Sequence, residues 1–177
     1  MDYVFSDKGI KRPTLNEVLA YENNILIEKF SATYNCDISV SKFIFNETKK
    51  LFWLFNESNF DKFDSLSIDN SLIILDEMWH TFILFTLDYS KFCHDLFGYY
   101  IHHKPTSELE KDKYLKEIEP LNQKELLEKK SNEKRPQYEY VYDKLGEETF
   151  KTWYLELNEK LNIKGSISIK NITLKGI

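Results

Sequence analysis

The sequence has few of the residues that form tight turns, with 5 glycines and 4 prolines among its 177 residues. A many-stranded β fold needs a turn after every short strand, so this shortage favours helices. No glycine-rich stretch of the kind that wraps a phosphate group is present either. The composition therefore predicts a mainly helical chain and argues against a nucleotide-binding loop.

Cysteines are also few, and the sequence has neither a net positive charge nor long apolar runs. Two cysteines, Cys36 and Cys93, are too few for a disulfide framework at this size, which favours a reducing compartment. The net charge is −5, and the basic cluster from Lys129 to Arg135 is interleaved with glutamates, so we expect no nucleic-acid partner. Charged residues interrupt every apolar stretch, and the first residues do not form a signal peptide. We expect a cytoplasmic protein with no membrane partner.

The remaining composition is that of a folded domain, with 42% hydrophobic, 30% charged and 15% aromatic residues. Such a length fits one compact unit, and the aromatic rings can build a substantial core. We expect an all-α fold, a single compact helical domain with a central buried helix. Residues 1–105 would form its core, residues 106–135 a charged peripheral helical segment, and residues 136–177 the C-terminal helices and a tail that pack on the core.

The spacing of apolar residues predicts three helices besides the central one. We expect one helix from about residue 14 to 32, N-capped by Thr14, and a second from about 40 to 55 that is followed by a polar loop. A later helix from about 88 to 97 would end at Gly98.

The charged segment and the C-terminal part have their own signals. Ser107 and Glu110 have the spacing of a capping box at the start of the charged segment. Near the end of the chain, Trp153 and Tyr154 mark a last helix that packs back on the core. The alternation around Ile167 and Ile169 predicts a short strand or an ordered tail.

The helix expected from about residue 70 to 85 is apolar on almost all sides, which is typical of a helix surrounded by others. Its polar exceptions are Asp76, Glu77, His80 and Thr81, which fall within one sector of the helical wheel. A polar sector on a central helix meets either solvent or another polar group inside the protein.

All four histidines lie between residues 75 and 105. Asp76 and His80 stand at i and i+4, so their side chains lie one above the other and can share a metal ion. A third ligand must come from an element that folds back. We choose His103 over His102, because neighbours in an extended segment point to opposite faces and His103 adjoins the restricted pair Lys104–Pro105.

Cys93, on the helix between these histidines, is the candidate fourth ligand or a close neighbour of the site. Carboxylate, imidazole and thiolate ligands together suit zinc, iron or another first-row transition metal. Two histidines and one carboxylate would leave positions open for a reactive centre, whereas four closed ligands would make a structural one.

Each of these residues also has a purely structural interpretation. Cys93 lies in an apolar stripe, where a free cysteine usually acts as a small hydrophobe. His80 held by Asp76 would make a satisfied buried pair that needs no metal. We expect His94 and His102 to be exposed. The aromatic residues of the region fit the core better than a substrate cage: Trp79, Phe82, Tyr89 and Phe92.

Two other chemistries are weaker. A nucleophile pair of Cys93 with His80 or His103 needs a cleft and a lowered thiol pKa, which the apolar surroundings oppose. A carboxylate pair of Asp76 with Glu77 is poor for glycoside hydrolysis, because adjacent residues on a helix diverge.

One ordered pattern runs through the region: Asp76, Trp79, His80, Phe82, Ile83, Leu84, Thr86, Tyr89, Phe92, Cys93, Gly98, Ile101, His103 and Pro105. It resembles bacterial members of the glycine-rich domain-containing protein-like family, in which a similar D-x-x-W-H-x-F-I-L-x-T-x-x-Y-x-x-F-C precedes G-x-x-I-x-H-x-P. The resemblance implies no particular activity, but it leaves His94 and His102 outside the pattern. Plant-like members have a further histidine at the position of Phe82, and this sequence has no glycine-rich tail.

Two functions follow as hypotheses. In the first, the protein binds zinc or iron through Asp76, His80 and His103, with Cys93 close by; if positions stay open, hydrolytic or oxidative chemistry is expected. In the second, it is a non-enzymatic helical module that binds a protein partner, and the same cluster only fixes the fold. The sequence leaves open whether there is catalysis. Convergence of Asp76, His80 and His103 on one point would favour the first hypothesis.

Overall fold

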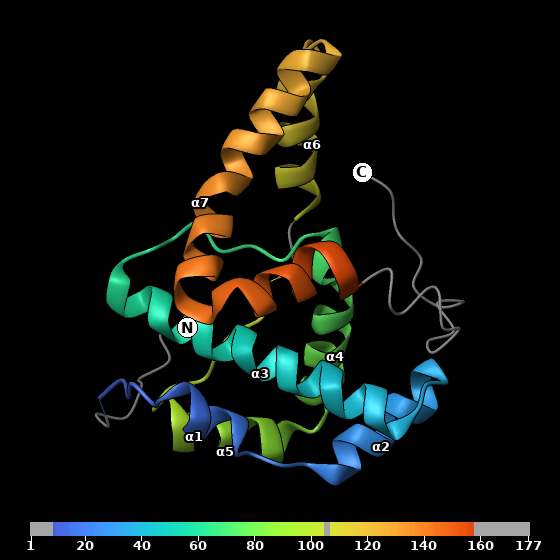
Figure 1. Ribbon diagram of the computed structural model, residues 1–177, viewed down its shortest axis with the longest axis vertical. Coiled ribbons are helices and arrows are strands. Elements are labelled where there is room, and N and C mark those ends of the chain that lie inside the picture. Colours follow the sequence, from blue (N-terminus) through green and yellow to red (C-terminus); the bar gives the residue numbers. More distant parts are fainter. Residues whose placement is uncertain (1–8, 105–106, 158–177) are drawn as a thin grey trace.

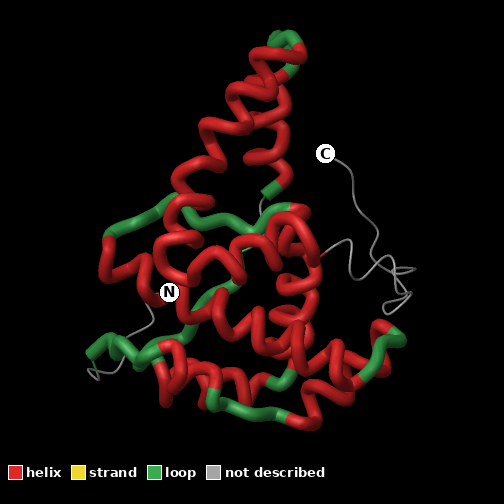
Figure 2. Tube along the Cα trace, in the orientation of Figure 1, coloured by secondary structure: helices red, strands yellow, loops and turns green. Residues whose placement is uncertain are grey.

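The computed structural model describes residues 9–104 and 107–157, and this part of the chain consists of helices and loops (Figure 2). The strand predicted around Ile167 and Ile169 lies outside the described residues. The elements are α1 (Leu15–Leu19), α2 (Asn24–Tyr34), α3 (Ile38–Asp61), the short 3-10 helix η1 (Asn70–Leu72), α4 (Ile73–Leu84), α5 (Thr86–Leu96), α6 (Glu108–Ile118), α7 (Gln123–Lys151) and the π-helical turn η2 (Thr152–Glu156). The all-α prediction is confirmed.

Helix α4 lies at the centre of what we call the body, residues 9–104, where it packs against α2, α3 and α5 (Figure 1). The Phe82 ring on α4 is fully buried and meets the rings of Phe45, Tyr89 and Phe92 at centroid distances of 5.5, 5.1 and 5.3 Å. Two of these contacts are edge-on and the one with Phe92 is tilted, and aromatic contacts of this kind add to the stability that burial itself provides. The prediction of a central buried helix is therefore confirmed.

The first predicted helix is divided in two, so the prediction of one continuous helix is wrong. Thr14 forms the predicted N-cap, but α1 ends at Leu19 and α2 begins only after Asn23, whose side chain accepts the Leu26 N–H at 2.9 Å. The buried Lys49 of α3 donates to the Leu19 and Tyr21 carbonyls at 2.6 and 2.7 Å. These tertiary hydrogen bonds satisfy carbonyls that a continuous helix would have used.

Helix α3 continues to Asp61, where the sequence predicted a polar loop. Its polar residues are buried against the segment before α1. Glu57 accepts two hydrogen bonds from the Arg12 guanidinium, at 2.9 and 2.7 Å, and Asn56 donates to the Lys11 carbonyl at 3.1 Å. The helix persists because partners distant in sequence bind the Glu57 carboxylate and the Asn56 amide nitrogen in place of water.

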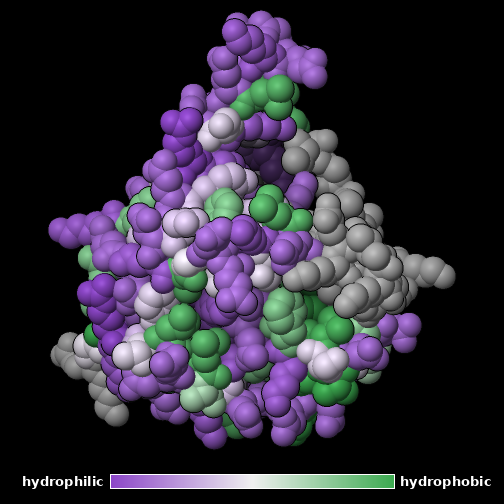
Figure 3. All heavy atoms as spheres, in the orientation of Figure 1, coloured by the Kyte–Doolittle hydropathy of each residue, from purple (hydrophilic) through white to green (hydrophobic). Residues whose placement is uncertain are grey.

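Helix α6 and the first part of α7 form a hairpin that projects from the body, which we call the arm, residues 107–145 (Figure 1). Ser107 and Glu110 form the predicted capping box. The face of the arm that Figure 3 shows is mostly hydrophilic. None of the helices in the described part of the chain has the length and apolar character needed to cross a membrane.

Gly146 ends the arm by bending α7. Its φ of 80° and ψ of 172° break the helical geometry, and the chain then returns across the body. The Trp153 indole is buried there and donates to Glu47 of α3 at 2.9 Å. Trp153 thus packs on the core, as the sequence predicted.

Candidate metal centre

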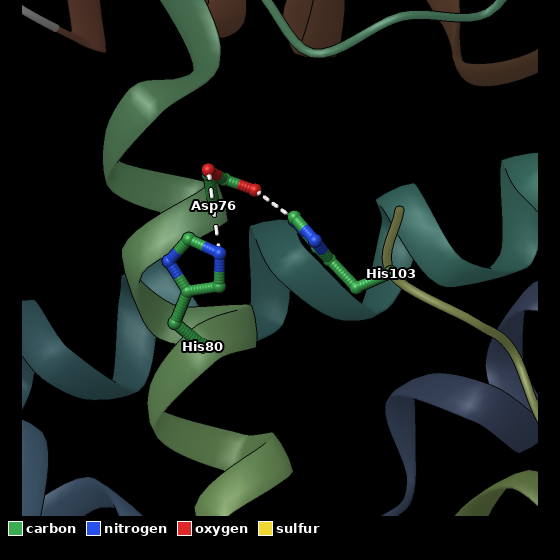
Figure 4. A group of neighbouring side chains, drawn as sticks. All are labelled: Asp76, His80 and His103. Atoms are coloured by element: carbon green, nitrogen blue, oxygen red, sulfur yellow. Dashed lines mark hydrogen bonds and ion pairs between the residues drawn. The ribbon is translucent and has the colours of Figure 1, made fainter. Parts of the chain in front are cut away.

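Two elements supply the polar group that the sequence singled out. Asp76 and His80 lie one turn apart on α4, and His103 reaches them from the segment that follows α5 (Figure 4). The carboxylate and both imidazoles point toward one another. Each contributes one ligand atom, and these three atoms lie within 4.8 Å of one another.

A buried chain of hydrogen bonds brings His103 to α4. The Trp79 indole donates to the Tyr89 hydroxyl at 2.9 Å, and that hydroxyl donates to the Ile101 carbonyl at 2.6 Å. Burial raises the pKa of Tyr89 well above its usual range, so its hydroxyl stays protonated as a donor. The edge of Trp79 also meets the His103 ring at a centroid distance of 4.6 Å. Trp79 and Tyr89 therefore fix the path of the segment two residues before His103.

Gly98 directs the chain into this path after α5. Its φ is +80°, and an added Cβ would lie 2.8 Å from the Gly9 carbonyl oxygen. A side chain at this position would be strained by both the backbone conformation and the close approach. The sequence assigned Gly98 to the end of the helix, and the structure confirms this.

The separations within the group are close to those around a metal ion. His103 Nε2 lies 2.6 Å from Asp76 Oδ1, and His80 Nε2 lies 3.8 Å from Asp76 Oδ2. Ligand atoms bonded at about 2.1 Å to zinc are roughly 3.4 Å apart at a tetrahedral angle. One observed pair is shorter than this and the other longer, so the side chains would have to shift for the group to close around an ion.

The group is open to solvent on one side. The side chains of His103 and Asp76 are 15% and 20% exposed, whereas that of His80 is 48% exposed. Two of the three side chains are thus mostly enclosed by the protein, and that of His80 lies at the edge of the group.

A second carboxylate, Glu77, lies beside His80. Its Oε2 is 3.9 Å from His80 Nδ1 and accepts a hydrogen bond from the Tyr34 hydroxyl at 2.5 Å. Glu77 is the main cause of the raised pKa of His80, to which Asp76 also contributes, while burial opposes the shift. In turn, the His80 ring lowers the pKa of Glu77 more than the Tyr34 hydroxyl does.

Cys93 is not part of the group. Its thiol is fully buried and lies beside Tyr89 and the Ile101 backbone, and burial raises its pKa to about 11. A protonated, enclosed thiol is a poor metal ligand and a poor nucleophile. The apolar interpretation of Cys93 therefore fits the structure better than ligation or a Cys–His pair.

The other residues of the motif divide as their spacing suggested. Trp79, Tyr89 and Phe92 are buried in the core, whereas His94 and His102 are exposed. Glu77 lies in the polar sector of the helical wheel, but its position in the sequence indicated no role for it. No pattern in the sequence indicated Tyr34, because it comes from α2 and meets Glu77 only through packing.

Comparison with known proteins identifies a family but no activity. A family profile, UCP032817-like, matches residues 20–147, which include Asp76, His80 and His103. The chain belongs to this family. Searches of curated proteins and of solved structures found no match. The resemblance to the glycine-rich domain-containing protein-like family stays a prediction.

Proposed function

We propose that the protein binds a divalent transition metal ion, zinc or iron, through Asp76, His80 and His103. The observation that carries this proposal is the convergence of their three ligand atoms within 4.8 Å from two separate elements. One carboxylate and two imidazoles are ligands that zinc and non-haem iron both accept.

Three protein ligands would leave the ion with open positions. The exposed side of His80 gives water or a small ligand access to them. An ion held in this way can activate water for hydrolysis or, if it is iron, support oxidative chemistry. Binding of an ion at His103 Nε2 would replace the hydrogen bond between His103 and Asp76.

Elemental analysis of protein purified without a histidine tag tests the proposal. We expect about one ion per chain in the wild type and loss of the ion in His80→Ala and Asp76→Asn. His94→Ala is the matched control, because this histidine is exposed on α5 and lies outside the group. Retention of the ion in His80→Ala and Asp76→Asn would refute the assignment.

The alternative is that the cluster is structural in a non-enzymatic, partner-binding module. The observation that favours it is the 2.6 Å hydrogen bond between His103 and Asp76, which already satisfies both groups without a metal. In that case zinc would not raise the melting temperature, and His103→Ala would lower the stability of the metal-free protein by about 1–3 kcal/mol. If the first proposal holds, zinc raises the melting temperature of the wild type but not of His80→Ala.

A further inference from the structure

His80 lies between two carboxylates, and only one of them belongs to the metal group. Its Nε2 is 3.8 Å from Asp76 Oδ2, and its Nδ1 is 3.9 Å from Glu77 Oε2. Because the two nitrogens of one ring face different carboxylates, a ligand role for one nitrogen leaves the other free for a hydrogen bond. Glu77 is outside the set of atoms that can share an ion.

Tyr34 holds Glu77 in place from a different helix. Its hydroxyl donates to Glu77 Oε2 at 2.5 Å, and its buried ring packs against Phe30 at a centroid distance of 4.4 Å. Burial raises the pKa of Tyr34 above its usual range, which keeps the hydroxyl protonated. The carboxylate is therefore anchored across the contact between α2 and α4 instead of moving freely at the surface.

His80 needs such an anchor more than His103 does. His103 is enclosed by Trp79 and bonded to Asp76, while about half of the His80 side chain is exposed. An exposed imidazole samples several ring orientations and both neutral tautomers, and only one combination presents a bare Nε2 to the ion. Glu77 Oε2 lies 3.9 Å from Nδ1, so a small rotation of the His80 ring would bring Nδ1–H within hydrogen-bond distance of this fixed acceptor and select that combination.

This inference rests on the proposed metal site. We propose that Glu77, held by Tyr34, is a positioning residue for that site: it accepts the Nδ1–H of His80 and so directs the unprotonated Nε2 toward Asp76 and the ion. Carboxylates that bind the outer nitrogen of a metal-ligating histidine typically change metal affinity about 10–100-fold.

Zinc affinity provides the first test. We expect Glu77→Ala to weaken zinc binding about 10–100-fold, and Tyr34→Phe to weaken it less but in the same direction. Glu77→Gln should fall between the wild type and Glu77→Ala, because the amide keeps an acceptor oxygen without the charge. The matched controls are Glu139→Ala and Tyr142→Phe on α7, which should bind zinc like the wild type.

Cobalt substitution distinguishes a positioning residue from a ligand. The visible spectrum of bound Co²⁺ reports the number and type of ligands, so Glu77→Ala should keep the wild-type spectrum once saturated. Loss of binding as complete as in His80→Ala, or a changed spectrum, would make Glu77 a ligand and overturn the positioning role. Wild-type affinity in both Glu77→Ala and Tyr34→Phe would overturn it as well, while leaving the metal site intact.

A metal-free measurement separates this inference from the proposed function. Long-range ¹H–¹⁵N correlation spectra of the neutral imidazoles report which nitrogen of His80 carries the proton. We expect the Nδ1–H tautomer in the wild type and a shift toward Nε2–H in Glu77→Ala. Failure of the wild type to bind zinc would refute the metal site and its positioning residue together. An unchanged tautomer in Glu77→Ala beside normal zinc binding by the wild type would refute only the role of Glu77.

Discussion

Half of the 12 residues of α4 are buried, whereas none of the 11 residues of α6 is. The local signals have the opposite distribution. Helix α6 begins with a complete capping box, while α4 follows Leu72 with no side-chain cap. The start of α6 is thus specified by its own sequence, whereas α4 is specified mainly by the helices packed around it. Since packing of an apolar face usually stabilises a helix more than local propensity does, the body should carry most of the stability.

Body and arm should differ most in the stability that is lost when an apolar side chain is truncated to alanine. Phe82→Ala should destabilise the protein by about 3–5 kcal/mol, because it leaves a cavity among buried rings. Leu127→Ala in the arm should change stability by less than about 0.5 kcal/mol, because that side chain is 63% exposed. Chemical denaturation of both variants measures the contrast. A comparable loss in Leu127→Ala would show that the arm packs against something in solution, and the comparison would fail.

A smaller loss of stability is expected when the buried hydrogen bonds that hold the His103 segment against α4 are removed. Tyr89→Phe leaves the Trp79 indole and the Ile101 carbonyl without their shared partner, at a cost of roughly 2–3 kcal/mol. Zinc binding should weaken in parallel, because the segment that carries His103 loses its anchor. Tyr142→Phe in the arm, where the ring is half exposed, should alter neither quantity. Thermal unfolding without zinc measures the loss of stability, and the shift in melting temperature on adding zinc measures binding. Normal zinc binding by Tyr89→Phe would mean that Trp79 alone positions His103.

A substitution at the junction between arm and body should cost less stability than Phe82→Ala but more than a change in an exposed ion pair. Gly146 has a φ of 80° and a ψ of 172°, a conformation that other residues adopt only with strain. Gly146→Ala should therefore destabilise the protein by roughly 1–3 kcal/mol. Gly9→Ala is matched to it, because both positions have open space for a Cβ and only Gly146 has a positive φ. Equal unfolding free energies for the two variants would show that the bend in α7 is not strained by a side chain.

The smallest effect is expected for ion pairs in the arm. Glu133 accepts hydrogen bonds from Lys129 and Tyr114, but its side chain is 40% exposed. Glu133→Gln should cost less than about 0.5 kcal/mol. The same exchange at the buried Glu57, which is paired with Arg12, should cost roughly 2 kcal/mol or more. Denaturant titrations of the two variants at one pH compare them directly, and equal losses would contradict the division into body and arm.

The sequence predicted the features that depend on short spacings. The N-cap at Thr14, the capping box at Ser107 and the end of the helix at Gly98 all involve residues within one turn of each other, and the structure confirms them. The pairing of Asp76 with His80 is of the same kind. These predictions hold because the geometry of a helical turn is nearly the same in every protein.

Predictions failed where distant residues compete with the local pattern. The periodicity from residue 14 to 32 suits one helix, yet Lys49 takes the carbonyls at the end of α1. The polar stretch after Phe55 suits a loop, yet Arg12 pairs with Glu57 and keeps it in α3. In both places hydrogen bonds to residues far along the chain replace those expected locally.

The candidate centre shows the same division between sequence and tertiary structure. The sequence by itself determined that α4 is buried and that Asp76 and His80 share one side of it, because burial follows hydrophobicity and the helical repeat fixes the spacing. Only the tertiary structure decided that His103 meets them, that Cys93 stays apart, and that Tyr34 reaches Glu77. Those contacts join segments separated by many residues, and their distances depend on how α2, α4 and α5 pack, which no local spacing specifies.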